Sequence, residues 1–357
     1  MKLIKKAAFT LGLSLLLCST VLGNTVGSST TLSSTATSTE KTLLTKEDAI
    51  SAAISMNNSL SLNSQEYEVL TEKLKTFDNI SSVLYQQTYI SRNQNVQKRE
   101  FLLDKITADI SKRYDNIVLL ELEIENLAAD IALQEESIKT LEKQQKVGLA
   151  TSLQLHASEV ELQTLKANKV AKEETLVSEK ANFRILTNRD LDKYALENTN
   201  KFTPFRVDNI SSHCQSRADI YLKYQKEFAD LQADHIFDNF VTGPLYADYL
   251  NAKYSAKSAS LTIEDSRDTL VQSLLSTHAS LLNMEEQINT LQSQIDLLKS
   301  QLSTLALQYK VGLVTKLDYD KQATRLKDLE FSLTSLINSY NNLALVLEKP
   351  WVQSMTS

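Results

Sequence analysis

Gln145-Lys-Val-Gly-Leu-Ala-Thr151 recurs as Tyr309-Lys-Val-Gly-Leu-Val-Thr315, 164 residues further along the chain. At the same offset, the apolar positions before the second copy coincide with those before the first without a gap. The second set is Leu281, Met284, Ile288, Leu291, Ile295, Leu298, Leu302 and Leu305, and the first is Ile117, Leu120, Ile124, Leu127, Ile131, Gln134, Ile138 and Leu141. A match of this extent indicates an internal duplication.

The spacing of these positions alternates between three and four residues, which places them on one stripe of a coiled-coil helix. The segment after the second copy continues the pattern at Leu326, Leu329, Leu333, Leu336, Tyr340, Leu343 and Leu347. Two such helices joined by a short turn pack antiparallel. The sequence therefore predicts two helical hairpins, with tips at Gly148 and Gly312.

Glycine and proline are scarce, so long helices can run without a break. Neither residue occurs between Gly27 and Gly148. A single helix over residues 98–147 would be about 75 Å long at the usual rise per residue. The second copy predicts a rod of similar length from about Lys253 to Lys310.

Turn chemistry explains part of the repeated motif. Glycine just past a helix end can adopt the left-handed conformation that terminates it. Thr151 or Ser152, and Thr315 in the second copy, can cap the helix that follows. Lys146 and Lys310 lie where a positive charge suits the helix dipole.

The turn does not explain the apolar residues beside each glycine, which are Val147 and Leu149 in the first tip and Val311 and Leu313 in the second. Repeated apolar residues at an exposed tip suggest docking to another protein. Local packing within the hairpin is the alternative.

The N-terminal residues are typical of a secretory signal peptide over 1–23, with early lysines followed by a short apolar run. Leu17 precedes Cys18 where a lipoprotein signal has a small residue, which argues against a lipid anchor. Residues 24–42 are rich in serine and threonine and predict a flexible tether. We expect a first repeat over 43–204, a second over 205–349 and a C-terminal tail over 350–357.

Several function classes are disfavoured by composition. The net charge of -6 does not attract nucleic acid. The few scattered glycines cannot form a phosphate-binding loop, so we expect no cofactor. The adjacent pair His213 and Cys214 points in different directions on a helix and is a poor metal site. Carboxylate pairs such as Glu135 with Glu136 are typical of solvated helix faces, so we expect no enzyme.

The duplicated tips, together with two further stretches, resemble the TolC family of outer-membrane efflux proteins over nearly all of the mature chain. Leu44-Thr-Lys-Glu-Asp-Ala49 is similar to the start of the family's first repeat. Ser216-Arg-Ala-Asp-Ile220 is similar to the start of its second repeat, with Ala218 in place of proline.

The resemblance implies a homotrimer in which each chain gives two hairpins to a twelve-helix tube. Such a tube conducts exported substrates and works with a periplasmic adaptor and an inner-membrane transporter. The implied adaptor-docking residues are Val147, Gly148, Leu149, Thr151, Val311, Gly312, Leu313 and Thr315. Tyr309 and Asp318 match positions that narrow the lumen, whereas Gln154 and Val314 replace the charged residues of the family pattern.

Family members that cross an outer membrane carry strands within each repeat, and this chain has little room for them. Val83–Arg92 does not alternate between apolar and polar residues, and residues 237–250 contain Gly243 and Pro244. We therefore predict an all-α, TolC-like α-barrel protomer with minimal or absent β-strands, in the cell envelope. A secreted coiled-coil structural or binding protein without a channel is the alternative.

Overall fold

The computed structural model describes residues 41–78, 80, 82–198, 200–236 and 246–354. The expected signal peptide and all but the end of the expected tether lie outside these residues. The elements, in chain order, are β1 (Thr42–Leu43), α1 (Lys46–Met56), α2 (Asn58–Lys75), α3 (Val83–Lys146), α4 (Ser152–Thr187), the short 3-10 helix η1 (Leu191–Lys193), β2 (Tyr194–Ala195), α5 (Ile210–Asp234), α6 (Tyr246–Lys310), α7 (Lys316–Glu348) and α8 (Trp351–Ser354).

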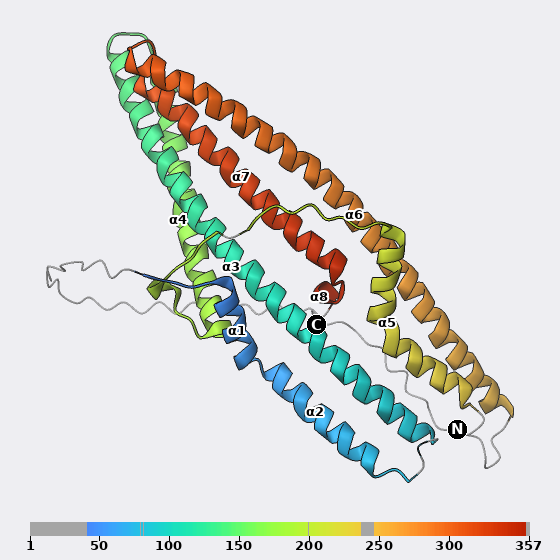
Figure 1. Cartoon of the computed structure of the whole chain (residues 1–357). Helices are drawn as coiled ribbons and strands as arrows, with labels where there is room; N and C mark the ends of the chain where they lie inside the picture. Colours follow the sequence, from blue (N-terminus) through green and yellow to red (C-terminus); the bar gives the residue numbers. More distant parts are fainter. Residues whose placement is uncertain (1–40, 79, 81, 199, 237–245, 355–357) are drawn as a thin grey trace, which may run out of the picture. The chain divides into compact units, whose positions relative to one another are not determined.

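Two long helical hairpins dominate the described residues, as predicted: α3 turns into α4, and α6 turns into α7 (Figure 1). The predicted seam forms the contact within each hairpin. Leu281, Ile288 and Ile295 are buried on α6, and Ile117 and Ile138 are buried on α3. Gln134, the polar member of the first seam, donates hydrogen bonds to the backbone oxygen of Ser158 (3.0 Å) and to Glu161 (3.0 Å).

Both leading helices begin earlier than predicted. Helix α3 has 64 residues and α6 has 65, so α3 is about 96 Å long. The stretch Val83–Arg92 forms the first turns of α3, where the Ser82 hydroxyl accepts a hydrogen bond from the Tyr85 amide (3.2 Å). No glycine or proline interrupts the run that follows, so the helix continues to the tip.

Each hairpin has its own apolar core. The first core gathers Leu44, Ala49, Ile110, Tyr114, Ile117 and Phe183. The second gathers Cys214, Ala218, Leu274, Leu281, Tyr340 and Leu347. Helix α3 packs against both α4 and α7, and α7 packs against both α3 and α6. The long helices therefore follow the order α4, α3, α7, α6.

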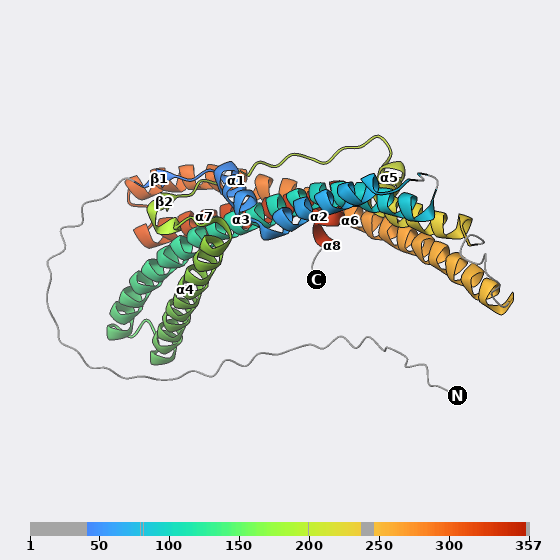
Figure 2. The same ribbon diagram turned by 90° about the horizontal axis from the view of Figure 1, so that it is seen from below.

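A short parallel strand pair ties the start of the first repeat to the segment after α4 (Figure 2). Thr42 pairs with Tyr194 and Leu43 with Ala195, and the Leu44 amide donates to the Ala195 oxygen at 3.0 Å. These four residues are the strand content of the described residues. Of the second candidate strand, residues 246–250 begin α6 and the rest lie outside the described residues.

The end of the chain returns to the first repeat through α8. Trp351 stacks on Phe101 of α3, with ring centroids 4.4 Å apart. Its indole nitrogen donates to Asp104 at 2.8 Å, and Lys349 reaches the other oxygen of Asp104 at 2.7 Å. The last described turn therefore joins the second repeat to α3.

In the described part of the chain, no helix combines the length and the apolar character needed to cross a bilayer.

Candidate functional site

The two hairpin tips have the same backbone conformation. Gly148 and Gly312 have φ angles of 77° and 75°. Leu149 donates its amide hydrogen to the Gln144 oxygen at 2.8 Å, and Gly148 donates to Gln145 at 2.9 Å. The second tip repeats both bonds, from Leu313 to Gln308 (2.9 Å) and from Gly312 to Tyr309 (3.0 Å). This pair of bonds is the Schellman motif, which requires the left-handed residue that glycine supplies.

Threonine caps the return helix at each tip. The Thr151 hydroxyl accepts from the Gln154 amide (3.2 Å), and the Gln154 side chain accepts from the Thr151 amide (2.8 Å), which completes a capping box. The Thr315 hydroxyl accepts from the Asp318 amide at 3.1 Å and donates to the Asp318 carboxylate at 2.7 Å. Of the two predicted caps at the first tip, Thr151 is the one used.

The apolar residues at the tips are not packed within their hairpins. A Schellman motif commonly rests the residue after its glycine on the preceding helix turn. Here that residue is 79% exposed in the first tip (Leu149) and 75% exposed in the second (Leu313). Val147 and Val311 are 70% and 71% exposed. Local packing therefore does not explain these side chains, and each tip presents an apolar surface to solvent.

The two residues implied for the lumen lie on opposite sides of the second turn. Tyr309 lies in the last turn of α6 and stacks on Tyr319 of α7, with ring centroids 6.0 Å apart. Asp318 lies in the first turn of α7 and is engaged by the Thr315 cap. Its carboxylate therefore has a local structural role, whatever else it faces. Gln154 occupies the matching place in the first tip and serves the same capping role.

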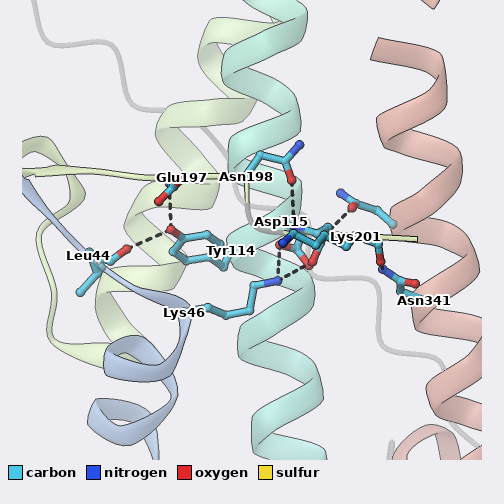
Figure 3. Close-up of polar contacts among 10 residues, drawn as sticks. Leu44, Lys46, Tyr114, Asp115, Glu197, Asn198, Lys201 and Asn341 are labelled. Carbon is cyan, nitrogen blue, oxygen red and sulfur yellow. Dashed lines mark hydrogen bonds and ion pairs between the residues drawn. The ribbon is translucent and has the colours of Figure 1, made fainter. Parts of the chain in front are cut away.

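A buried polar cluster, which we call the junction, joins the start of the first repeat to the linker between the repeats and to α7 (Figure 3). The ammonium of Lys46 lies 2.7 Å from Asp115 on α3, and both side chains are largely buried. Lys46 also donates to the Asn200 side chain of the linker at 2.8 Å. The Asn200 amide in turn donates to Asn338 of α7. The junction thus contains a paired buried charge and links four separate segments, which are α1, α3, the linker and α7.

Two tyrosine hydroxyls hold the linker at its two ends. Tyr114 donates to the Leu44 oxygen (2.9 Å) and accepts from the Glu197 amide (3.0 Å). Burial raises the pKa of Tyr114, so its hydroxyl stays protonated. Tyr340 accepts from the Phe205 amide at 2.7 Å. Each repeat therefore contributes one buried tyrosine that fixes the linker backbone.

Charged pairs outside the junction differ in burial. Arg206 of the linker pairs with Glu285 of α6 through a bidentate contact, and its hydrogen bond lowers the pKa of Glu285. Arg217, in the stretch resembling the start of the second repeat, pairs with Glu348 at the end of α7. The junction could not be predicted from the sequence, because its contacts join polar residues that lie far apart in the chain, such as Lys46 and Asn200 at a separation of 154 positions.

His213 and Cys214, the adjacent pair noted in the sequence, have different surroundings. Cys214 is fully buried in the second core, and the His213 ring nitrogen lies 3.4 Å from the Leu347 oxygen. Within the described ranges, no three histidine, cysteine, aspartate or glutamate side chains gather in a way that could hold a metal ion.

The outer helices α4 and α6 expose apolar side chains along their length. On α4 these include Leu153, Val160, Val170, Val177 and Ile185, and on α6 they include Leu282, Leu297 and Leu307. Their spacing keeps each set on one side of its helix. Helix α7, which lies between two neighbours, has no large apolar side chain that is exposed. Apart from the N-terminal part of α3, where Leu84, Tyr89 and Val96 are exposed, the exposed apolar side chains of the long helices therefore lie on the two outer helices.

No protein-family model matches this sequence, and no curated protein matches it. Solved structures do match. Crystal structures of CusC, described as showing folding and transmembrane channel formation, align over 87% of this chain and 92% of theirs, with a TM-score of 0.63 and 10% identity. The outer membrane protein VceC of Vibrio cholerae aligns over 85% of this chain and 96% of its own, with a TM-score of 0.55 and 14% identity.

A third match is the outer membrane channel CmeC of Campylobacter jejuni, which covers 87% of each chain with a TM-score of 0.55 and 12% identity. The chain has a TolC-like fold. At these identities the likeness concerns the fold, and it confirms the expected all-α architecture of paired hairpins. The tips, the junction and the exposed faces of α4 and α6 are the features from which a function can be argued.

Proposed function

We propose that this protein is the TolC-like channel component of a cell-envelope efflux or secretion system. It conducts exported substrates passively, as a homotrimeric helical tube, and performs no catalysis. The observation that carries the proposal is the unequal packing of the long helices in a duplicated chain. The similarity of this fold to solved structures supports the same proposal, because CmeC is an outer membrane channel and VceC is an outer membrane protein.

The duplication relates α3 to α6 and α4 to α7. Within the chain, α3 of the first repeat packs on α7 of the second. The equivalent contact for the remaining pair would place α6 of one chain against α4 of the next. Both of these helices expose the apolar side chains that such a contact would bury. A contact between two different faces closes into a ring when the rotation between neighbouring copies divides a full turn, as it would in a trimer.

The tips are proposed to dock onto a periplasmic adaptor, which joins the tube to an inner-membrane transporter. Leu149 and Leu313 support this because they are exposed without a local reason. Val147, Gly148, Thr151, Val311, Gly312 and Thr315 complete the docking surface. Tyr309 and Asp318 are proposed to face the lumen near the tips. The protein would then be exported, and lie in the outer membrane where the source has one.

The assembly is tested by the mass of the purified protein from light scattering, with and without detergent, followed by particle imaging. A hollow particle of three chains is the expected result. The double variant Val177→Glu/Ile185→Glu places charges on the exposed face of α4 and should reduce the mass to one chain. Gln163→Glu, on the same helix but polar in the parent, is the matched control and should stay assembled.

A solid rod of one or two chains, unaffected by the α4 variants, would refute the tube. It would favour the alternative of a secreted coiled-coil structural or binding protein of the envelope.

Docking is tested by photo-crosslinking in the source cells, with the crosslinker placed at Leu149 or Leu313. We expect a crosslinked product with a protein other than this chain. The same crosslinker at Val170 of α4 is expected to capture a second copy instead. If the tip positions give only copies of this chain, the tips do not serve as the docking surface.

A further inference from the structure

A cavity of about 350 Å³ lies between the two repeats, outside the junction and far along α3 from the tips. It is walled by α2 and α3 of the first repeat and by α5 of the second. Its volume falls within the range of small-molecule sites. The lining residues include Glu66, Asn95, Lys98, Phe101, Tyr221 and Gln225. The cavity therefore combines hydrogen-bonding groups with aromatic surface.

The side chain of Asn95 lines this cavity and is only half satisfied. Asn95 is 4% exposed. Its Nδ2 donates to the Glu66 carboxylate at 2.8 Å, whereas its Oδ1 is buried without any hydrogen-bond partner, the one such side-chain atom in the described part of the chain. Exchanging the two ends of the amide would set the oxygen against the carboxylate, so the bond to Glu66 fixes the orientation. A buried acceptor without a donor is costly, and a donor on a bound molecule would remove that cost.

The side chains around this oxygen leave room for adjustment. The oxygen is shielded from solvent, so a ligand reaches it by shifting its neighbours. Ser91 and Lys98 lie one turn before and one turn after Asn95 on α3, and both line the cavity. The Lys98 ammonium is 3.7 Å from Glu66, and each side chain is about half exposed. Because an exposed pair of this kind is weak, a ligand can displace Lys98 at little cost.

The polar groups of the cavity favour a neutral ligand that carries hydroxyl groups. Among the described lining residues Glu66 is the one acid and Lys98 the one base, so their charges cancel. Gln94 and Gln225 add exposed amides, and an amide side chain both donates and accepts hydrogen bonds. A hydroxyl group also does both. A phosphate group, in contrast, is bound by several positive charges, which this lining does not offer.

Two aromatic rings supply the apolar part of the wall. Phe101 and Tyr221 both line the cavity, with ring centroids 6.0 Å apart and planes inclined by 31°. Trp351 stacks on Phe101 at 4.4 Å and holds that ring in place. A sugar ring has apolar C–H faces that pack on aromatic rings and a rim of hydroxyls that bond to polar side chains. Aromatic rings beside amide groups suit both parts of such a ligand.

We propose that this cavity binds a neutral sugar, either free or as a unit of a glycan. The sugar ring packs against Tyr221, one hydroxyl donates to the Asn95 oxygen, and other hydroxyls bond to Gln94 and Gln225. Because the walls come from both repeats, an occupied cavity also ties the first repeat to the second. The inference goes beyond the proposed channel function and does not depend on it.

The test is saturation-transfer difference NMR of the whole purified protein with sugars at millimolar concentration. The probes are glucose, galactose, mannose and N-acetylglucosamine, together with the disaccharides cellobiose and chitobiose. We expect saturable binding of at least one of them, in the millimolar range because the ligand is small. Succinate, an anion without hydroxyl groups, is the control ligand and should give no signal. Tighter binding of a disaccharide than of its monomer would identify a glycan as the ligand, and equal binding a free sugar.

Two variants locate the binding. Asn95→Leu removes the unpartnered oxygen, and Gln94→Ala/Gln225→Ala removes two exposed amides of the wall. Each should weaken sugar binding about tenfold. The double variant keeps the test decisive if Asn95→Leu does not fold, which circular dichroism and urea unfolding will show. Gln65→Ala/Gln272→Ala removes two exposed amides outside the cavity and is the matched control, with binding like that of the parent.

The absence of a signal from all six sugars would overturn the proposal and would mean that water alone fills the cavity. Binding of equal strength in the parent and in the folded cavity variants would also overturn it, since the sugar would then bind elsewhere. Neither result bears on whether the chain forms a tube, because the mass measurement decides that separately.

Discussion

Helices α4 and α7 return from the two hairpin tips and are related by the duplication, yet they have different surroundings. Helix α7 has α6 on one side and α3 on the other, and its large apolar side chains are covered. Helix α4 has α3 as its long neighbour and leaves Val177 and Ile185 exposed. Equivalent helices in a repeat differ in this way when one lies inside the chain's own packing and the other lies at its edge.

The starts of the two repeats differ in the same sense. Lys46 of the first repeat is paired with Asp115 inside the junction, whereas Arg217 of the second is paired with Glu348 in a more exposed setting. The first pair joins α1 to α3, and Lys46 also holds Asn200 of the linker, which bonds to Asn338 of α7. The second joins two helices of one repeat. We therefore expect the buried Lys46–Asp115 pair to contribute more to stability than the more exposed Arg217–Glu348 pair.

The largest effect is expected at the junction. Lys46→Met should lower the free energy of unfolding by about 3–5 kcal/mol, because it leaves Asp115 buried without a partner. Urea unfolding at neutral pH measures the change. The double variant Lys46→Met/Asp115→Leu should recover most of the loss, and Arg217→Met should cost much less than Lys46→Met. Equal losses at Lys46 and Arg217 would show that the two repeat starts contribute alike to stability.

A smaller contrast is expected between the two return helices. Leu347→Ala on α7 should cost about 2–5 kcal/mol of unfolding free energy, because Leu347 is fully buried in the second core. Ile185→Ala, near the end of α4, should change the stability of the isolated chain by about 0.5 kcal/mol or less. Denaturant unfolding of dilute protein compares them. Similar costs would mean that α4 is covered within its own chain.

The tips should respond alike, and by less. Gly148→Ala and Gly312→Ala each force a side chain into the left-handed region, at a cost of about 1–2 kcal/mol. No atom other than the adjoining residues lies within 4 Å of the added carbon at either glycine, so the cost is conformational. Thermal unfolding followed by circular dichroism should show two equal shifts with the helix content retained. Unequal shifts would show that one tip contacts something the other does not.

The smallest effect is expected at the ion pair between Arg206 of the linker and Glu285 of α6. The hydrogen bond from Arg206 lowers the pKa of Glu285. This pair therefore stabilises the fold above the ordinary glutamate pKa of about 4.3, and the contribution is lost as the pH falls through the lowered value. Arg206→Gln should flatten the acid side of a stability–pH profile slightly. An unchanged profile would show that solvent screens the pair completely.

Much of the fold could be predicted because a heptad spacing and a duplicated turn are local signals. The positions from Leu281 to Leu298 gave the buried seam of α6, and Gly148 and Gly312 gave the turns. The early start of α3 was missed because no glycine or proline marks where the helix begins. Its capping residue, Ser82, is one of several serines in this part of the sequence. The junction was missed because Lys46, Asn200 and Asn338 meet only after the two repeats have packed.

The site was predicted in part. The apolar residues at the tips were identified from their repetition, and the structure shows that they are exposed. The partner that the tips bind could not be predicted, because binding also depends on the surface of that partner. The face of α4 was overlooked because Val160, Val170 and Val177 are interspersed with lysine and glutamate, and the pattern reads as a solvated helix.

Trp351 is the single tryptophan of the chain, and it lies against Phe101 at the point where the second repeat meets the first. Its fluorescence is therefore a built-in optical probe of that contact. Detachment of the C-terminal turn would move the indole from a buried, stacked site into water and shift its emission to the red, even if every hairpin stayed helical. Undocking of the chain end and melting of the helices can thus be followed separately in one unlabelled sample.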